Sequence, residues 1–302
     1  MDILKAAITR ARARNARVVL PEIDDPRIAA AARQLRSEGI AQPLTLADAR
    51  PAAAYVDLLL ANRPGLKPSL ALKLLDKPLI RAAAMVAAGE AEAMTAGVTA
   101  PTRRVIEAAT LAIGMAEGVQ TPSSFFLMIL PGTLHQGGRT LVFADCAVNT
   151  DPDAAQLADI ARASAASAKA LLGEARVAFL SYATGASGAG PSVDRVRAAA
   201  TATGFSGPVQ ADAALNAVIA AQKGHSAPPA NTLIFPNLNA ANIAYKLLQE
   251  LAGAQALGPI LQGFRKPVCD LSRGASTDDI IAATALTLAL APHHLADKYS
   301  GG

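Results

Sequence analysis

A short strand, a capped helix and a second strand open the chain, and this pattern constrains the fold most. Residues Val18–Leu20 form a brief apolar run of the kind that predicts a buried strand. Asp25 then precedes Pro26, an N-cap followed by proline at the first helical position, and the predicted helix continues to about Ser37. The next strand is expected at residues 44–46. A strand–helix–strand unit of this kind predicts a parallel sheet.

The same alternation of strands and helices recurs after a break near residue 115. The sequence therefore predicts an α/β protein with two α/β domains and mostly parallel sheets. Residues 66–113 are expected to be mostly helical, with a turn at 97–101. The later strands are predicted at 123–130, 140–143 (after a hairpin turn), 176–180, 209–211 and 232–235, and the later helices at 153–172, from 192, at 240–251 and from 278.

Charge and composition exclude several classes of protein. The 302 residues carry 28 basic and 24 acidic side chains, a net charge of +4, without the clustered basic residues of a nucleic-acid binder. The longest apolar stretches, such as 280–292, are too short and interrupted to cross a bilayer, and the N-terminus lacks the apolar core of a signal peptide. Cys146, Cys269 and the histidines show no metal-ligand spacing. We therefore expect a cytoplasmic protein without nucleic-acid, membrane or metal binding, whose arginines meet small anions.

A polar segment between two apolar ones, residues 266–281, gives the clearest chemical signal. From residue 270 to residue 279 Leu271 is the only large apolar side chain, so core packing does not explain this composition. Arg273 offers a planar donor fork suited to phosphate, Ser272 can donate to a developing oxyanion, and Asp279 can accept a proton. The alternative is a plain helix start, in which a hydroxyl at 276 or 277 is the N-cap and Asp279 lies in the first turn.

A glycine-rich loop at residues 181–190 follows one predicted strand and precedes a helix. Glycines such as Gly188 permit close backbone approach, and free N–H groups at a helix start favour phosphate. Ser181, Thr184 and Ser187 add hydroxyl donors. The loop lacks the lysine of a nucleotide-hydrolysing P-loop and is not a dinucleotide fingerprint, so it predicts binding of phosphate or an acyl phosphate, or else a tight turn.

Two asparagines stand three residues apart where the helix after the 232–235 strand begins. Asn239 is either the N-cap of that helix or a ligand-facing group, whereas Asn242 would point along the same face toward a cleft. Lys246 extends this face by one turn. Asp145 and Asn149 end another strand, where they either line the same cleft or form a turn.

The polar segment at 266–281 is also where the chain resembles the phosphate acetyl/butyryltransferase family. Further blocks agree in the order of the family, and together they span nearly the whole chain: 18–22, 141–149, 180–188 and 233–246. The resemblance implies a fold related to isocitrate and isopropylmalate dehydrogenases, with an interdomain cleft. It implies one domain of residues 1–115 plus 261–302, a second of 116–260, and a homodimer.

The resemblance further implies reversible transfer of an acetyl group between coenzyme A and inorganic phosphate, by direct attack of the thiolate on acetyl phosphate. Ser272 would stabilise the oxyanion, Arg273 would bind the phosphate, and Asp279 would take the thiol proton. Arg63 and Arg104 match arginines implicated in coenzyme A binding, and Lys246 would join them. Coenzyme A would be a substrate, and no metal or redox cofactor is implied.

Departures from the family pattern leave the acyl chain and coenzyme specificity open. The segment 97–104 is shorter than usual and lacks a histidine, the segment 226–231 has lost a lysine, and Asn237 replaces a common aspartate. Alternatives are a butyryl or propionyl donor, a non-catalytic sensor of acyl-CoA or acetyl phosphate, and a dehydrogenase of the related fold, which the lack of clustered metal-binding aspartates disfavours. The physiological direction, the effectors and the dimer interface stay undetermined.

Overall fold

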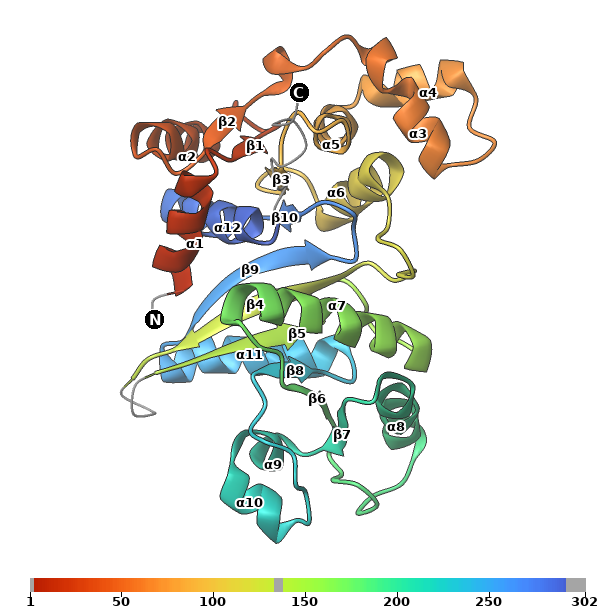
Figure 1. Cartoon of the computed structure of the whole chain (residues 1–302), viewed down its shortest axis with the longest axis vertical. Coiled ribbons are helices and arrows are strands. Elements are labelled where there is room, and N and C mark those ends of the chain that lie inside the picture. The colour runs from red at the N-terminus through yellow and green to blue at the C-terminus, as the bar shows by residue number, and fades with distance from the viewer. Residues whose placement is uncertain (1–2, 133–137, 292–302) are drawn as a thin grey trace, which may run out of the picture.

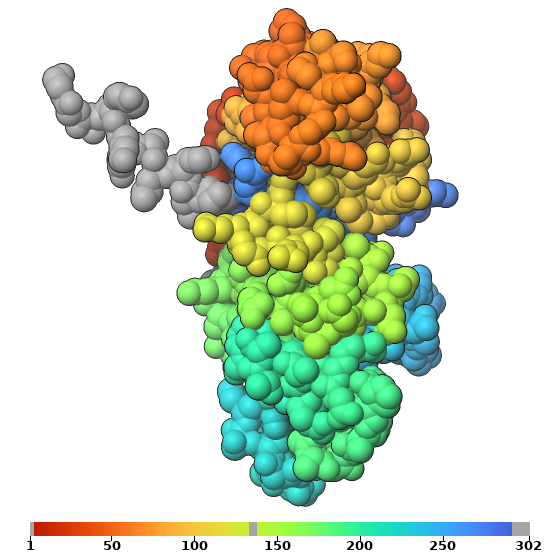
Figure 2. Space-filling model, turned by 90° about the vertical axis from the view of Figure 1, so that its right-hand side faces the viewer, coloured from red at the N-terminus to blue at the C-terminus, as the bar shows by residue number. Residues whose placement is uncertain are grey.

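The computed structural model describes residues 3–132 and 138–291. It is an elongated molecule, with the segments around residues 50–75 at one end and the segments around residues 190–220 at the other (Figure 2). One mixed sheet of ten strands runs through it, in the order β2-β1-β3-β10-β9-β4-β5-β8-β6-β7 (Figure 1). The predicted α/β class is therefore confirmed, and the described strands form one sheet rather than one for each lobe.

Two parallel groups of strands form the wings of this sheet. The first wing contains β1 (Arg17–Val19), β2 (Gln42–Leu44), β3 (Ala93–Ala96) and β10 (Val268–Asp270). The second contains β5 (Arg139–Ala144), β6 (Val177–Leu180), β7 (Ser206–Val209) and β8 (Thr232–Ile234). The predicted parallel pairing of the opening unit is thus confirmed, although β2 lies two residues before its expected position.

Two long antiparallel strands, β4 (Ser123–Leu130) and β9 (Gln255–Gln262), join the wings. The sequence analysis did not identify β3, β9 or β10. β3 is short and contains alanine and methionine, and β9 contains Gly258 and Pro259, which are poor strand formers in isolation. The predicted hairpin between β4 and β5 is confirmed by their pairing, while most of its turn lies outside the described residues.

The four helices predicted in the second half of the chain lie close to their predicted positions, whereas the short helices at 211–215 and 217–222 were not predicted. The segment 66–113 contains β3 besides its helices. The bounds of the described helices are α1 (Ile3–Ala13), α2 (Pro26–Ser37), α3 (Val56–Asn62), α4 (Pro68–Leu75), α5 (Pro78–Ala87), α6 (Thr102–Ala108), α7 (Ala154–Leu172), α8 (Pro191–Thr203), α9 (Ala211–Leu215), α10 (Ala217–Gln222), α11 (Leu238–Ala252) and α12 (Thr277–Ala289), with short 3₁₀ turns at Leu46–Asp48 and Ala52–Tyr55 and a π turn at Ala109–Ile113. None of the described helices is both long and apolar enough to cross a membrane.

The two faces of the sheet are packed differently, and this difference creates the site. On one face a single hydrophobic cluster runs across both wings, because α1, α2, α7, α8 and α12 cover it continuously. On the other face one cluster lies under α3 to α6 and a separate one under α9 and α11. The boundary between these two clusters lies near the ends of β10 and β5, so a hollow forms there.

The C-terminal helix α12 returns to the N-terminal part of the chain and packs against α1 and α2 (Figure 1). Ser276 is its N-cap and accepts from the backbone N–H of Asp279 at 3.2 Å. The polar segment that precedes α12 therefore crosses the end of the sheet between β10 and α12. This placement fixes the backbone on which Ser272 and Arg273 stand.

The start of α11 corrects the interpretation of Asn239 as an N-cap. The N-cap is Asn237, whose Oδ1 accepts from the backbone N–H of Ala240 at 3.0 Å. Asn239 lies inside the first turn and is exposed. The departure at position 237 therefore has a structural role, because asparagine caps a helix as well as aspartate does.

We expect Asn237→Ala to lower the free energy of unfolding by about 1 kcal/mol, because α11 loses its capping acceptor. The matched variant Asn239→Ala removes an exposed side chain of the same type two residues away and should change it by less than about 0.5 kcal/mol. Urea denaturation of both variants measures the difference. Equal losses would contradict the assignment of the N-cap.

Candidate active site

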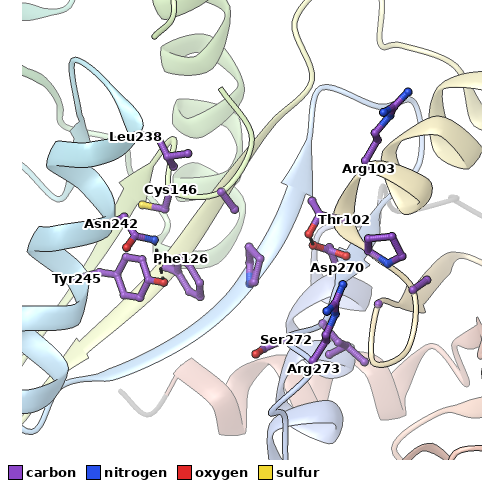
Figure 3. Close-up of a pocket in the computed structure, with 16 residues that line it drawn as sticks. Thr102, Arg103, Phe126, Cys146, Leu238, Asn242, Tyr245, Asp270, Ser272 and Arg273 are labelled. Carbon is purple, nitrogen blue, oxygen red and sulfur yellow. Dashed lines mark hydrogen bonds between the residues drawn. The ribbon is translucent and has the colours of Figure 1, made fainter. Parts of the chain in front are cut away.

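A cavity of about 510 Å³, here called the main cavity, lies where β10 ends, between the two wings. Gly97, residues 100–103 and residues 270–273 line it from the first wing. Its other lining residues come from the central strands and the second wing: Phe126, Pro259, Cys146, Ala147, Leu238, Asn242 and Tyr245. Figure 3 shows these two sets of side chains facing each other across β9.

The turn that carries Ser272 and Arg273 is held by its backbone. Arg27 donates from Nη1 to the carbonyl oxygens of Arg273 at 2.7 Å and Ala275 at 3.0 Å, and Asp25 pairs with Arg27 at 2.9 Å. The side chains of Ser272 and Arg273 are exposed and line the main cavity. The turn therefore presents a hydroxyl and a guanidinium together, as the sequence predicted.

A second cavity of about 260 Å³, the side cavity, adjoins the first, and Ser272 lines both. Asp279 lines the side cavity, and its Oδ2 accepts from the backbone N–H of Ser276 at 3.0 Å and from its hydroxyl at 2.7 Å. Together with the bond to the Asp279 N–H, these contacts form a reciprocal capping box. Asp279 thus lines a cavity together with Ser272, and it also lies in the first turn of a helix capped by Ser276, as the alternative interpretation described.

Asp270 and Thr102 form a contact at the wall of the main cavity that the sequence analysis did not single out. The Thr102 hydroxyl donates to Oδ2 of Asp270 at 2.6 Å, which ties the first turn of α6 to the end of β10 (Figure 3). Asp270 is only 2% exposed, and its Oδ1 is buried without a hydrogen-bond partner among the described residues. Burial raises the pKa of Asp270 to about 6, the Thr102 hydrogen bond opposes this rise, and the charge of Glu22 adds to it.

Glu22 holds the loop between β3 and α6. Its carboxylate accepts from the backbone N–H groups of residues 97–100 at 2.7 to 3.0 Å and from the Thr99 hydroxyl at 2.6 Å. Burial opposes ionisation of Glu22, but these hydrogen bonds outweigh it and keep its pKa below the ordinary value. Glu22 belongs to the quoted block 18–22, yet the sequence alone cannot reveal that its partner is a loop far along the chain.

The two neighbouring arginines of α6 lie in different places, one at the main cavity and one on the outer surface. Arg103 lines the main cavity, whereas Arg104 forms an ion pair with Glu107 at 2.8 Å and lines a separate surface hollow. Arg63 is the C-cap residue of α3, is exposed, and lines neither the main nor the side cavity. The geometry therefore favours Arg103 over the predicted Arg104 as the arginine that meets a ligand.

α11 contributes two of the predicted side chains. Asn242 lines the main cavity and donates to the Tyr245 hydroxyl at 3.3 Å (Figure 3). Lys246 lines the side cavity, with its ammonium 5.2 Å from the centre of the Tyr245 ring. Asn239 lines neither cavity. The helix thus brings Asn242 and Lys246 to the site and leaves Asn239 outside it.

The glycine-rich loop follows β6, which lies toward the far end of the second wing and is separated from β10 by β9, β4, β5 and β8 (Figure 1). Two of its hydroxyls bind their own segment, because Ser187 Oγ accepts from the Thr184 N–H at 2.9 Å and Ser181 Oγ from the Ala183 N–H at 3.3 Å. The Thr184 hydroxyl instead accepts from the Gln210 N–H after β7 at 3.1 Å. Neither Gly188 nor these hydroxyls line the main or side cavity. The phosphate-binding role stays a prediction, and the contacts are those of the tight-turn alternative.

Asp145 also has a turn-forming role. It is buried and accepts from the Ser124 N–H at 3.1 Å and from the Asn149 N–H at 2.8 Å, so it connects the end of β5 to β4.

Within residues 3–132 and 138–291, no cluster of three or more His, Cys, Asp or Glu side chains could hold a metal ion. The side chains that line the main cavity supply hydroxyl and amide hydrogen-bond donors, two guanidinium groups and one carboxyl group.

The chain matches the protein-family model described as phosphate acetyl/butaryl transferase over residues 52–288. The chain belongs to this family. The family predicted from the sequence blocks is therefore confirmed.

Two named relatives support membership of the same family. The chain is 39% identical over 316 residues to phosphate acetyltransferase of Nitrosomonas europaea, covering 93% of this chain and 45% of that protein. It is 39% identical over 306 residues to phosphate acetyltransferase of Paracoccus denitrificans, covering 92% of this chain and 95% of that protein. The chain thus spans less than half of one relative and nearly all of the other.

A solved structure supports the fold. EutD phosphotransacetylase from Staphylococcus aureus superposes with a TM-score of 0.85 at 30% identity, covering 96% of this chain and 98% of that one. The overall fold of this chain is therefore shared with that solved structure.

We expect the stability contributed by Asp270 to depend on pH in a defined direction. Its folded pKa of about 6 lies above the ordinary 3.8, so the folded state favours the protonated form. Relative to Asp270→Asn, the free energy of unfolding of the wild type should fall by up to about 3 kcal/mol as the pH rises from 3.8 to about 6 and then stay level. Denaturant titrations of both proteins across this range measure the difference, and parallel curves would contradict the burial of an unpaired carboxyl.

Proposed function

We propose that the protein catalyses reversible transfer of an acetyl group between coenzyme A and inorganic phosphate. The observation that carries this proposal is the Ser272–Arg273 turn, which presents a hydroxyl donor and a guanidinium to one cavity while Arg27 holds its backbone. The family membership and the names of the relatives support it.

In the proposed reaction the thiolate of coenzyme A attacks the carbonyl carbon of acetyl phosphate directly. Ser272 donates a hydrogen bond to the developing oxyanion, a role worth about 3 to 4 kcal/mol in other acyl-transfer enzymes. Arg273 binds the phosphate and neutralises its charge as the bond to carbon breaks. A carboxylate takes the thiol proton, and the family resemblance gives this role to Asp279, which lines the side cavity with Ser272.

Coenzyme A is proposed to enter along the cationic side of the main cavity. Arg103 supports this proposal because it lines the cavity from α6, opposite Asn242. Lys246 is the cation of the side cavity. Arg63 is proposed only from the resemblance, as an outer contact for the nucleotide end of coenzyme A.

A donor with a longer acyl chain is the second candidate. The side cavity favours it, because Phe126, Leu257 and Ala283 give it an apolar part next to Ser272. One methylene group changes discrimination by only about 1 to 3 kcal/mol, so butyryl or propionyl phosphate would use the same mechanism.

We also propose that the protein is a homodimer, that it is cytoplasmic, and that its fold is isocitrate dehydrogenase-like with two domains. α11 supports the first of these, because Ile243, Leu247 and Leu251 stand one turn apart and are 58%, 52% and 82% exposed. An apolar stripe of this kind is typical of a surface that another protein covers.

The test of the function is thioester formation from coenzyme A and acetyl phosphate, followed by absorbance, with propionyl and butyryl phosphate in parallel. Rapid turnover of acetyl phosphate is the expected result. Preference for a longer donor would keep the mechanism and change the substrate. A folded protein that binds coenzyme A without turnover would instead indicate a sensor.

We expect Ser272→Ala to lower kcat by about 10²- to 10³-fold, because the oxyanion loses its hydroxyl donor. The side chain is exposed, so the circular dichroism spectrum and the melting temperature should not change. Steady-state kinetics at saturating coenzyme A measure the effect. A rate near that of the wild type would remove Ser272 from the reaction.

We expect Arg103→Ala to raise the KM for coenzyme A or phosphate by about tenfold or more, because a charged hydrogen bond is worth about 1.5 to 3 kcal/mol. Arg104→Ala is the matched control, since Arg104 is adjacent and pairs with Glu107 outside the main cavity. The control should change the KM by less than about twofold. The reverse ranking would restore Arg104 as the ligand-binding arginine.

A further inference from the structure

We propose that a cavity beside α7 is a binding site for a small organic anion with an apolar body. This cavity, here called the α7 cavity, has a volume of about 550 Å³, which is within the usual size range of ligand sites. Its walls come from residues 116–119, from α7 between Arg162 and Ala170, from residues 261–267 and from Leu290 at the end of α12. None of these residues lines the main or the side cavity, so the α7 cavity is a separate site.

The charge at the α7 cavity is mainly positive. Arg162, Arg265 and Lys266 line it, and the exposed Glu117 is the one carboxylate among the lining residues. Arg162 forms an ion pair at 3.5 Å with Asp159, which stands outside the lining. Three cations thus face two carboxylates, and the cavity keeps an excess of positive charge that favours an anion.

Arg265 is held in place by neutral partners. Its Nε donates to the carbonyl oxygen of Ile113 at 2.8 Å, and its Nη2 donates to Oδ1 of Asn62. Because neither partner carries a charge, these bonds fix the guanidinium without neutralising it. Arg265 therefore contributes a positive field at the cavity rather than an arm that is free to move.

Lys266 is the cation that an anion would meet most directly. It is half-buried, and its ammonium has no hydrogen-bond or ion-pair partner within residues 3–132 and 138–291. A partly buried cation without a partner loses hydration that nothing in its surroundings replaces. The carbonyl oxygen of the next residue, Pro267, accepts from the Met94 N–H at 3.3 Å, so the sheet holds the backbone beside Lys266. A bound anion would supply the missing partner at a fixed position.

Two buried polar side chains also line the α7 cavity, Ser167 and Gln262, which are 7% and 6% exposed. The Gln262 amide group donates to Ser123 at 3.0 Å and to Ser164 at 2.8 Å, and its oxygen accepts from the Ser167 hydroxyl at 3.1 Å. Both amide hydrogens are therefore in use, and the capacity that remains on Ser167 and Gln262 is that of acceptors. A hydroxyl or N–H group of the ligand can donate to them.

The remaining wall is apolar, and its backbone is fixed. Val119, Ala163 and Phe264 contribute to it. The segments that carry Val119 and Phe264 are joined by a hydrogen bond from the Ala116 N–H to the Gly263 carbonyl oxygen at 2.8 Å. The cavity is thus formed before a ligand enters, and it offers an apolar surface between the cations and the buried acceptors. A ligand that has an anionic group on an apolar body matches this arrangement.

The α7 cavity and the turn of Ser272 lie at opposite ends of β10. Lys266 stands two residues before this strand, and Ser272 stands two residues after it. The two sites share a strand but no lining residue, so an anion at Lys266 does not exclude a ligand at Ser272. The inference therefore does not depend on the proposed acyl transfer.

The test is a fluorescence titration of the full chain with 8-anilinonaphthalene-1-sulfonate. This probe carries a sulfonate and an N–H donor on aromatic rings, and N-phenyl-1-naphthylamine is its neutral counterpart without the sulfonate. We expect Lys266→Met to raise the Kd of the anionic probe by about tenfold or more, because a charged hydrogen bond is lost. The Kd of the neutral probe should change by less than about twofold, since methionine keeps the apolar stem of the side chain.

Two further variants serve as controls. Lys169→Met removes an exposed lysine of α7 that does not line the cavity, and it should leave the Kd of both probes within about twofold of the wild type. Ala163→Phe fills the cavity from α7 and should weaken the binding of both probes. Circular dichroism spectra and melting temperatures show that each variant is folded.

Three results would overturn the proposal. The first is an anionic probe that does not bind the wild type, or that binds Lys266→Met equally well. The second is binding that Arg273→Ala abolishes and Lys266→Met does not alter, because the probe would then lie in the main cavity. The third is binding that disappears as the protein concentration and the sedimenting mass rise together, because a second copy of the chain would then cover the cavity. Thioester formation enters none of these results, so failure of the proposed function would leave the site standing.

Discussion

The hydrogen-bond ladder between β4 and β9 is the interaction on which the rest of the structure depends. These long antiparallel strands join two parallel wings into one sheet, and Cys269, Ile260, Phe125 and Ala144 are paired in a single row across β10, β9, β4 and β5. β10 and β5 run in opposite directions, and both end at or next to this row. The two chain segments that follow these strands can then face one cavity, although they come from opposite wings.

Packing on the two faces of the sheet decides where that cavity opens. The face under α7 and α12 is sealed by one continuous hydrophobic cluster, so it gives the wings a shared core. The other face has two clusters with a boundary between them, because α6 and α11 belong to different wings. Polar side chains can stand at this boundary without the cost of burial in a core, and Ser272 and Arg273 do so.

Two carboxylates fix the wall of the cavity, and they differ in how well they are satisfied. Glu22 accepts hydrogen bonds at both oxygens from the loop before α6, which compensates for its burial and keeps it ionised. Asp270 accepts one bond from Thr102, and its second oxygen is buried without a partner among the described residues. The first arrangement is that of a structural anchor, whereas the second leaves a carboxyl whose ionisation costs free energy near neutral pH. Such incompletely satisfied groups are typical of functional sites.

The sequence by itself determined the α/β class, most helices and strands of the second wing, the family, and the Ser272–Arg273 pair, because these depend on local patterns of hydrophobicity, capping and residue type. Only the tertiary structure decided that one sheet joins both wings, that Arg103 rather than Arg104 lines the cavity, and that Asn237 rather than Asn239 caps α11. It also decided the partners of Asp270 and Glu22, which lie far away in sequence. The physical reason is that strand pairing, burial and long-range hydrogen bonds depend on which segments meet in space, and no local pattern encodes that.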